Sequence, residues 1–423
     1  MTKGKYITAI DLGSANISTV ISQIIPDEKP RIIGVGKAPS SGLRRGVIVD
    51  LEEVTASIKN SLEQAERMAG IKVEEAFVSV GGSHLSCNAT QGVIAVGRAD
   101  GEVTEDDVER VVEASQAINI PHNYEILHTI PKSFNLDNQS GIKEPVGMSG
   151  VRLEMKGVIV TAFASYLKNI SKCLNDVGVD LQGFVASPLA ASKAALNKRQ
   201  KELGVALVDI GGGTTSLAVY EERELIYLSV LPVGGGHITN DAAIGMRTSV
   251  DVAEQVKLKY GSALPGEIGK REQINLAEIN PEEEGSVSRK HICEIMEARA
   301  EEIFQMVERE LKKINRSALL PAGAVLTGGG ACLHGMVDLS KENLKLPAQV
   351  GFPRELSGLV DKVDDPSFSV AVGIILWVLE EGGEENSLKS SGSGFGFADK
   401  FKKSFPSDKI KTLKRWLEGF LPK

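Results

Sequence analysis

The sequence is poor in cysteine. Only four cysteines occur among 423 residues, and no two of them form a C-x-x-C pair: Cys87, Cys173, Cys293 and Cys332. Such wide spacing argues against a disulfide framework and against a cysteine zinc site. We therefore expect a protein of a reducing compartment, in which these cysteines fill the core as small apolar side chains.

The sequence also lacks a long hydrophobic run. Its longest apolar stretch, S-V-A-V-G-I-I-L-W-V-L at 369–379, is shorter than the ~20 residues that a membrane-spanning helix needs. The first residues lead almost directly into a strand-like run, without the apolar segment and cleavage site of a secretory signal peptide. These absences predict a chain that is not secreted by that route and a buried core helix at 369–379.

Acidic residues outnumber basic residues over the chain as a whole, but not near its end. The formal net charge is −8, which divides into +5 on residues 399–423 and −13 on all residues before them. An acidic body argues against a nucleic-acid-binding groove, so we expect no nucleic acid among the partners. A small basic segment on an acidic chain suits an anionic membrane surface.

Two segments of the chain follow the same pattern. Residues 7–36 read as strand, tight Gly turn, strand, turn and strand, and residues 205–236 repeat this order. In each copy the first apolar strand closes on Asp and Gly, and helical sequence follows at 51–70 and 250–260. The chain is 42% hydrophobic and can bury a large core. The repetition therefore predicts two related α/β halves.

Residues 82–160 interrupt this pattern. They hold strand-like pieces at 87–96 and 152–162, and a charged helix that T-E-D-D opens as a capping box at Thr104. We expect a small inserted α+β subdomain, and insertions of this kind usually carry partner contacts. A long amphipathic helix at 289–316 is instead expected to pack on its own domain.

The chain ends in a linker-like segment and a short amphipathic helix. Residues 381–405 are rich in Gly and Ser and too poor in apolar side chains to fold alone, so we expect a flexible linker. Within 406–423, an apolar stripe is formed by Ile410, Leu413, Trp416, Leu417, Phe420 and Leu421, opposite Lys409, Lys411, Lys414 and Arg415. Such a helix lies in a membrane interface without crossing it. Periodicity alone supports docking on the protein's own core about equally well.

Two Asp-Gly turns could hold phosphate. They are D-L-G-S-A-N at 11–16 and D-I-G-G-G-T-T at 209–215. Backbone N–H groups of glycine can wrap a phosphate because no Cβ stands in the way, and the hydroxyls of Ser14, Thr214 and Thr215 can donate further bonds. The two aspartates would face a divalent metal through water, because Mg²⁺ keeps much of its hydration shell. Taken singly, each turn could also be an ordinary hairpin turn that binds no ligand.

A third Gly cluster strengthens the case for a nucleotide. V-L-T-G-G-G-A at 325–331 is an apolar strand that meets a Gly turn before another helix. Glycines there permit the flat approach of a base or ribose. Two phosphate turns on related halves, together with this late T-G-G-G, predict a nucleotide held in a cleft between the halves.

These motifs resemble the actin/Hsp70/sugar-kinase superfamily and, within it, the FtsA family of bacterial cell-division actins. The resemblance runs from Tyr6 to about Leu379; I-D-L-G-S and L-T-G-G-G-A are shared by the superfamily. The block G-I-K-E-P-V-G-M-S-G-V-R-L-E at 141–154, and the insertion that holds it, point to FtsA. The implied fold is an α/β, actin-like (ribonuclease H-like) two-half ATPase fold with an inserted α+β subdomain and a C-terminal amphipathic helix.

The resemblance also implies domain limits. The first actin-like domain would comprise 1–81 and 161–190, with 366–380 packing back onto it, and the second 191–365, with 241–316 as its outer subdomain. The insertion, the linker and the terminal helix keep the limits given above.

The residues of the site follow from the same resemblance. The phosphate turns would be Gly13, Ser14, Ala15 and Asn16, and Gly211, Gly212, Gly213, Thr214 and Thr215, with Asp11 and Asp209 on Mg²⁺. Near the phosphates would lie Gly234, Gly235 and Gly236, near ribose and base Glu254 and Lys257, and in the adenosine loop Gly328, Gly329 and Gly330. Asp50 would orient an attacking water. An Asp before a helix is equally an ordinary N-cap, and an exposed helix offers many charges like Glu254 and Lys257.

The implied function is that of an ATP- and Mg²⁺-binding division protein, at most a slow ATPase, which polymerises with itself at the cytoplasmic face of the cell membrane at the septum. Its partners would be FtsZ, anionic membrane lipids and other division proteins. One alternative is the type IV pilus assembly actin, which is not expected to carry a linker with a membrane-seeking helix. Another is an Hsp70-like or kinase-like enzyme, for which we find no peptide-binding domain, substrate pocket or catalytic base.

Overall fold

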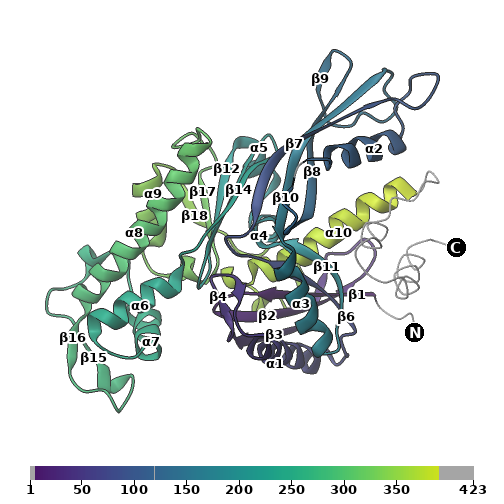
Figure 1. Cartoon of the computed structure of the whole chain (residues 1–423). Helices are drawn as coiled ribbons and strands as arrows, with labels where there is room; N and C mark the ends of the chain where they lie inside the picture. Colours follow the sequence, from purple (N-terminus) through teal and green to yellow (C-terminus); the bar gives the residue numbers. More distant parts are fainter. Residues whose placement is uncertain (1–4, 119, 390–423) are drawn as a thin grey trace. The chain divides into compact units, whose positions relative to one another are not determined.

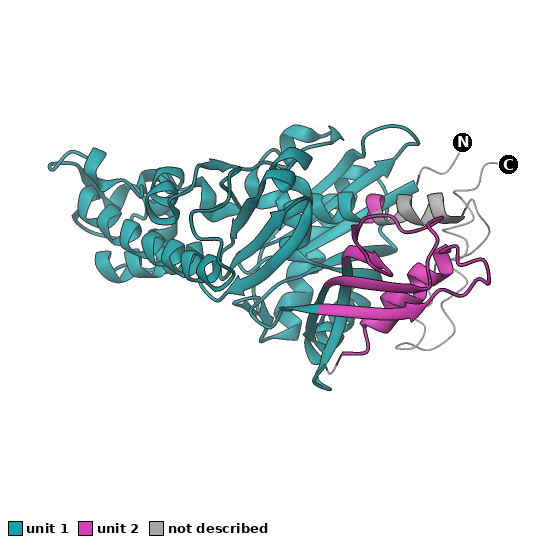
Figure 2. Ribbon diagram, turned by 90° about the horizontal axis from the view of Figure 1, so that it is seen from above, with its two compact units in different colours: residues 1–89, 119–130, 158–377 teal, residues 90–118, 131–157, 378–423 magenta. Residues whose placement is uncertain are grey.

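Two compact units make up the protein. The structure, a computed structural model, describes residues 5–118 and 120–389. Unit 1 comprises Met1–Ala89, Asn119–Ile130 and Val158–Trp377, and unit 2 comprises Thr90–Ile118, Pro131–Gly157 and Val378–Lys423 (Figure 2). The expected helix at 406–423 and most of the expected linker lie outside the described residues.

The first half of unit 1 is built on a six-stranded sheet in the order β11-β6-β1-β2-β3-β19 (Figure 1). Its strands are β1 (Lys5–Leu12), β2 (Asn16–Ile24), β3 (Arg31–Pro39), β6 (Glu75–Val80), β11 (Asp180–Ala186) and β19 (Ser357–Gly358), and the hairpin of β4 (Leu43–Arg44) and β5 (Val47–Ile48) follows β3. Strands β1, β2 and β3 are antiparallel neighbours, while β6 pairs parallel with β1 and β11. The first Gly turn is therefore the hairpin between β1 and β2, as predicted.

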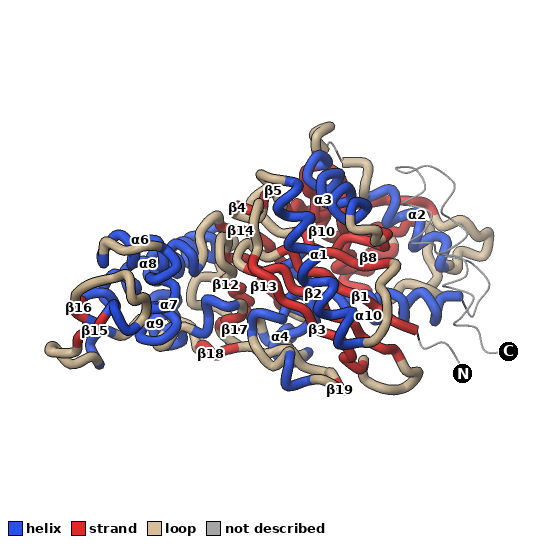
Figure 3. The backbone as a smooth tube through the Cα atoms, turned by 90° about the horizontal axis from the view of Figure 1, so that it is seen from below, coloured by secondary structure: helices blue, strands red, loops and turns tan. Residues whose placement is uncertain are grey.

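Helix α1 (Leu51–Ala69) packs on this sheet, where it contacts β2 and β3 (Figure 3). Its apolar residues recur at helical spacing, and Val54, Ile58 and Leu62 are buried. Gly70 ends the helix with a φ of 69°, a left-handed conformation that favours glycine. The helix predicted at 51–70 is thus confirmed.

The second half repeats the design with a five-stranded sheet in the order β14-β13-β12-β17-β18. Its strands are β12 (Val205–Ile210), β13 (Thr215–Glu221), β14 (Glu224–Leu231), β17 (Ala324–Thr327) and β18 (Ala348–Val350). Again the first three strands are antiparallel neighbours, and the first pairs parallel with a later strand, β17. The prediction of two related α/β halves is confirmed.

Helices complete unit 1. They are α3 (Ala164–Asp176), α4 (Ser187–Ala195), α5 (Lys198–Leu203), α6 (Gly235–Met246), α7 (Val250–Tyr260), α8 (Arg289–Lys313) and α9 (Met336–Leu344), with the short strands β15 (Gln273–Asn275) and β16 (Ser286–Ser288) between α7 and α8. Helix α8 contacts α6 and α9 and buries one face, which includes Ile292, Met296, Phe304 and Leu311. This long helix therefore packs on its own domain, as expected.

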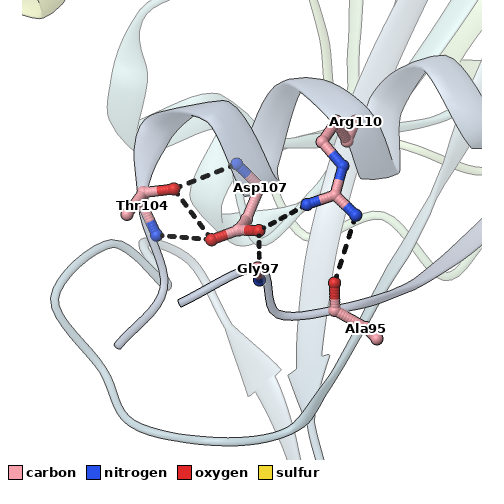
Figure 4. Close-up of polar contacts among 5 residues, drawn as sticks. All are labelled: Ala95, Gly97, Thr104, Asp107 and Arg110. Atoms are coloured by element: carbon pink, nitrogen blue, oxygen red, sulfur yellow. Dashed lines mark hydrogen bonds and ion pairs between the residues drawn. The ribbon is translucent and has the colours of Figure 1, made fainter. Parts of the chain in front are cut away.

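Unit 2 holds most of the inserted subdomain. Its sheet has the order β7-β10-β8-β9, and its helix is α2; the limits are β7 (Ser86–Ala95), α2 (Glu105–Ser115), β8 (Tyr124–Leu136), β9 (Gln139–Ile142) and β10 (Arg152–Phe163). A separate core includes Val111, Phe134, Leu153 and Met155. The predicted capping box at Thr104 is present, with Asp107 as its partner (Figure 4). The insertion is α+β, as predicted.

Helix α10 (Ser369–Lys389) contains the long apolar run of the sequence. Val370, Ala371, Val372, Ile374 and Ile375 are all buried, which confirms the expected core helix. The helix continues to Lys389, so it includes the first residues of the segment expected to be a linker. Within residues 5–118 and 120–389, no helix is long and apolar enough to cross a bilayer.

Candidate functional site

Asp11 stands near the end of β1, where the neighbouring strand β6 orients its carboxylate. The hydroxyl of Ser79 donates a hydrogen bond of 2.8 Å to Oδ1 of Asp11 and accepts one of 2.8 Å from the backbone N–H of Leu12. Burial raises the pKa of Asp11 to about 6, while Ser79 and the ammonium of Lys37 oppose this rise. The sequence does not single out Ser79, because its only signal is one hydroxyl in the apolar strand E-A-F-V-S-V.

Asp209 occupies the corresponding place on β12 and is 9% exposed. Burial raises its pKa to about 7, and the negative charge of Asp11 raises it as well. The carboxylates of Asp11 and Asp209, one from each half, are therefore close enough to repel each other when both are ionised. Repulsion of this kind is relieved by a divalent cation, so the pair fits the predicted Mg²⁺ position.

No larger metal-binding cluster exists in the part of the chain that the structure describes, where no three His, Cys, Asp or Glu side chains are grouped to hold an ion. A cation between Asp11 and Asp209 would therefore need further oxygen ligands. Mg²⁺ takes such ligands from water and from the phosphates of a nucleotide, usually with only one or two protein carboxylates.

The two Gly-rich turns touch each other. A Cβ atom added to Gly212 would lie 2.7 Å from Cβ of Ala15, and one added to Gly213 would lie 3.0 Å from Oγ of Ser14, so only glycine permits this approach. The hydroxyl of Ser14 accepts a hydrogen bond of 3.1 Å from the backbone N–H of Gly46. Its own proton thus remains available for a ligand. The structure brings the two predicted phosphate turns together from opposite halves.

The two predicted threonines differ in their roles. The carbonyl of Thr214 accepts a hydrogen bond of 2.9 Å from the N–H of Gly211, which closes the turn. Thr215 is fully buried, and its hydroxyl donates a bond of 2.8 Å to the carbonyl of Val233. The hydroxyl of Thr215 is therefore engaged inside the protein, and Thr214 is the better candidate to reach a phosphate.

The P-V-G-G-G segment at the start of α6 holds the second turn in place through backbone hydrogen bonds. The N–H groups of Gly235 and Gly236 donate hydrogen bonds of 2.8 Å to the carbonyls of Gly211 and Gly212. The N–H of Gly234 bonds over 3.1 Å to the ring of the histidine three residues further on. These three N–H groups are occupied within the protein. Their geometry suits a positioning role for the turn.

The third Gly cluster reaches the same place. Gly328 lies beside Asp209, and the residues after it form a short 3₁₀ turn, Gly329–Cys332. A Cβ atom added to Gly235 would lie 3.6 Å from Cα of Gly330. All three predicted Gly clusters therefore meet around the end of β12.

Glu254 and Lys257 on α7 point toward the start of α6. Nζ of Lys257 lies 2.7 Å from Oε2 of Glu254 and donates hydrogen bonds of 2.8 Å to Oγ1 of Thr239 and 3.4 Å to the carbonyl of Gly235. Thr239 also bonds to Glu254 and is 2% exposed. With its side chain 14% exposed, Lys257 is not a solvated surface charge. Thr239, which the sequence does not single out, holds both charges in place.

Asp50 is the N-cap of α1. Its side chain accepts a hydrogen bond of 3.0 Å from the backbone N–H of Glu53, and the residue is exposed. The structure thus gives this carboxylate the capping role that the sequence left open beside a catalytic one.

Comparisons with known proteins point to one family. A family model described as "Cell division protein FtsA" matches residues 206–373, and one described as "SHS2 domain inserted in FTSA" matches residues 82–161. Among curated proteins, the chain is 36% identical over 416 residues to the cell division protein FtsA of Pseudomonas aeruginosa, with 98% of each chain covered. It is 37% identical over 375 residues to FtsA of Bacillus subtilis, covering 89% of this chain and 84% of that one.

Solved structures with the same fold have much lower sequence identity. The PilM–PilN type IV pilus biogenesis complex superposes with a TM-score of 0.64 at 17% identity, covering 88% of this chain and 98% of the other. MreB5 of Spiroplasma citri bound to ADP superposes with a TM-score of 0.52 at 14% identity, covering 91% and 99%. These likenesses support the predicted actin-like fold and nothing finer.

Proposed function

The chain belongs to the FtsA family of bacterial cell-division proteins, and from this premise we propose that it is an ATP-binding, actin-like protein that polymerises on the inner face of the cytoplasmic membrane. There it tethers FtsZ filaments and recruits other division proteins. The observation that carries the proposal is the meeting of two Asp-Gly turns from related halves. FtsA relatives that match nearly the whole chain favour this function over the type IV pilus alternative, which only a similar fold supports.

The nucleotide is proposed to be ATP with Mg²⁺. The metal, held through water by Asp11 and Asp209, would neutralise charge on the phosphates. The turns around Ser14 and Gly212 would donate N–H and hydroxyl groups to the phosphate oxygens, while Gly328–Gly330, Glu254 and Lys257 would contact the adenosine. The solved MreB5 structure holds ADP in the same fold, which supports this choice. Calorimetric titration of the full chain with MgATP tests it; absence of saturable binding would refute the site.

Asp50 is proposed to orient a water molecule if the protein hydrolyses ATP. Asp50→Asn separates this role from capping, because Asn caps a helix as well as Asp does but carries no charge. A single-turnover hydrolysis rate that drops in Asp50→Asn, with unchanged thermal unfolding, would support the proposal. An unchanged hydrolysis rate would show that Asp50 only caps helix α1 and does not orient a water molecule.

The FtsZ contact is proposed to lie on the outer subdomain, at the groove between α6 and α8. Asp241, Ile295, Ala298, Arg299 and Glu302 line this groove, and Arg299 bridges it through ion pairs with both acids. Ile244 lies one turn from Asp241 on α6 and is 76% exposed, so it offers an apolar anchor beside these charges. An exposed apolar residue rimmed by charge is typical of a protein-binding surface.

Co-sedimentation with FtsZ filaments tests this surface. Ile244→Glu should abolish co-sedimentation without affecting the fold, because the side chain is already exposed. Leu319→Glu is the matched control, since Leu319 is 64% exposed outside the proposed surface. Equal loss in both variants, or no loss in Ile244→Glu, would contradict the assignment.

The membrane contact is proposed to be the amphipathic helix at 406–423, which the sequence predicts beyond the described residues. A single interfacial helix binds weakly and reversibly. Polymerisation would place many such helices on one filament, and their effective concentration would make the attachment firm. Pelleting of the full chain with anionic liposomes, with and without FtsZ, tests attachment and tethering in one experiment.

A further inference from the structure

The two proposed phosphate turns contain no positive charge. Neither 11–16 nor 209–215 includes a Lys or Arg. A nucleotide triphosphate carries several negative charges, and a single Mg²⁺ leaves part of that charge unneutralised. Phosphate sites commonly add a lysine as a point charge. Any protein cation that contacts these phosphates therefore belongs to another element of the chain.

Lys37 lies on the same face of the first sheet as Asp11. Asp11 on β1 is paired with Ser18 on β2, and Ser18 is paired with Lys37 on β3. Direct cross-strand partners point to the same face, and two strand spacings separate Asp11 from Lys37 by roughly 10 Å at Cα. Ser18 between them has a small side chain and is 2% exposed. Asp11, Ser18 and Lys37 thus form a row across three strands, and this row begins at the first Gly turn.

The ammonium of Lys37 lies between the first turn and the third. Its Nζ donates a hydrogen bond of 3.0 Å to Oγ of Ser367 and stands 5.2 Å from the ring centroid of Phe368. A Cβ atom added to Gly329 would lie 3.9 Å from Cβ of that same Ser367. At its other side, the charge is close enough to Asp11 to oppose the burial that raises the pKa of this carboxyl.

Lys37 forms no ion pair with a carboxylate in the part of the chain that the structure describes. Its two side-chain partners, a hydroxyl and an aromatic ring, are neutral. Some lysines of the described residues have a carboxylate partner; Lys29 lies 2.9 Å from Glu355, and Lys257 lies 2.7 Å from Glu254. A cation aimed between two Gly turns without a carboxylate partner fits an anionic ligand.

We propose that Lys37 is a further ligand-binding residue of this site, whose ammonium contacts a phosphate oxygen of the bound nucleotide. The inference rests on the proposed nucleotide site. Ser367 and the ring of Phe368 hold the side chain in position before the nucleotide arrives, which lowers the entropy cost of the contact. Lys37 on β3 also bonds to Ser367, just before α10. A phosphate bound to Lys37 would therefore be connected to both of these segments.

Calorimetric titration of the full chain with MgATP and MgADP tests the proposal. Lys37→Met keeps the apolar stem beside Phe368 and removes the charge, so it should weaken both ligands about tenfold, as expected for a charge-assisted hydrogen bond. Lys37→Arg should keep most of the affinity, because the positive charge remains. Lys59→Met, at an exposed lysine of α1, is the matched control and should bind like the wild type.

Ser367→Ala distinguishes the effect of the Lys37 charge from the effect of the hydrogen bond between Lys37 and Ser367. This variant removes the hydroxyl but leaves the ammonium, so it should bind MgATP almost as well as the wild type. A loss as large as that of Lys37→Met would overturn the proposal in favour of a purely structural link. Wild-type affinity in Lys37→Met would also overturn it while leaving the nucleotide site intact, whereas a wild-type chain that fails to bind MgATP would refute the proposed function itself.

Discussion

Gly328 lies so close to the carboxylate of Asp209 that no side chain fits at position 328. A Cβ atom at position 328 would lie 2.3 Å from Oδ1 of Asp209, and the φ of Gly328 is 79°. Both constraints exclude a side chain, the first by contact and the second by backbone conformation. The third Gly cluster thus packs directly against the carboxylate of the second half.

Gly328→Ala should therefore displace the carboxylate of Asp209. We expect the affinity for MgATP to fall about 10-fold to 100-fold, as when a group that orients a metal ligand is disturbed. Gly178→Ala is the matched control, because its φ is 78° but nothing lies within 4 Å of its added Cβ. Both variants should lose about 1 kcal/mol of folding free energy to backbone strain, and Gly328→Ala should lose more because its Cβ would also lie 2.6 Å from the backbone carbonyl oxygen of Ile210. Only Gly328→Ala should lose affinity, and equal affinities in calorimetry would contradict the role of this contact.

Asp209→Asn should make the nucleotide-free protein more stable and bind MgATP more weakly. Burial and Asp11 raise the pKa of Asp209 to about 7, so the carboxyl costs folding free energy above about pH 4, the usual pKa of an Asp, and the cost is complete above about pH 7. Without metal at pH 8, the variant should melt a few degrees higher than the wild type. The difference should shrink as the pH falls below about 7 and vanish only at about pH 4, where the carboxyl is protonated in the unfolded chain as well. In calorimetry at pH 8, MgATP should bind about tenfold more weakly; a variant that melts lower would contradict this account.

The fold was largely predictable because its signals are local. An Asp and a Gly that close an apolar strand, and helical spacing such as that of Val54, Ile58 and Leu62, depend on neighbours in the sequence. Both Asp-Gly turns and the late T-G-G-G could therefore be identified as one candidate site. The capping box at Thr104 is local in the same sense, because the cap and its partner are three residues apart.

The supporting residues of the site could not be predicted, because each acts on a residue far away in the sequence. Ser79 reaches Asp11 only because β6 lies beside β1, and Lys37 shares its face only through the register of β2 with β3. Thr239 holds Lys257 across two helices. Strand order, register and helix packing are tertiary properties that one sequence does not determine residue by residue. The roles of Gly235 and Gly236 in supporting the turn are of the same kind.

Thr239→Val should release the two charges that Thr239 positions. The hydroxyl accepts a hydrogen bond of 2.8 Å from Lys257 and bonds to Glu254, and valine has the same shape without these bonds. We expect about fivefold weaker binding of MgATP, less than one full charge-assisted bond is worth. Thr239→Ser keeps the hydroxyl and should restore the affinity. A serine variant as weak as the valine variant would point to packing, not to positioning.

Asp107→Ala should destabilise unit 2 by about 2–4 kcal/mol, because the carboxylate is 1% exposed and binds four donors (Figure 4). The N–H and hydroxyl of Thr104, the N–H of Gly97 and the guanidinium of Arg110 all donate to it, at 2.8 to 3.0 Å. Asp106→Ala is the matched control on the same turn, since Asp106 is exposed. Faster amide exchange across residues 90–118 and 131–157 should appear in the first variant alone.

The same carboxylate should make this subdomain sensitive to acid. Burial opposes ionisation of Asp107, but the bonds from Thr104 and Gly97 and the charge of Arg110 outweigh it and hold the pKa below its usual value. A lowered folded pKa gives stability that is present above about pH 4 and is lost as the pH falls further. The difference in exchange between wild type and Asp107→Ala should therefore shrink below pH 4. A difference that stays constant down to pH 2 would contradict this origin.

Trp416→Glu should abolish pelleting with anionic liposomes, because it places a charge in the apolar stripe of the predicted helix at 406–423. Phe397→Glu is the matched control, since it adds the same charge to the expected linker and should pellet like the wild type. Because attachment is proposed to depend on many weak helices acting together, its strength should rise with polymerisation. We expect the bound nucleotide to favour polymerisation, so a variant that weakens nucleotide binding, such as Gly328→Ala, should pellet less well at low protein and nucleotide concentrations even though its terminal helix is intact. If Gly328→Ala pelleted as completely as the wild type at every concentration, the membrane contact would be independent of the nucleotide site, and the proposed link between the two would be wrong.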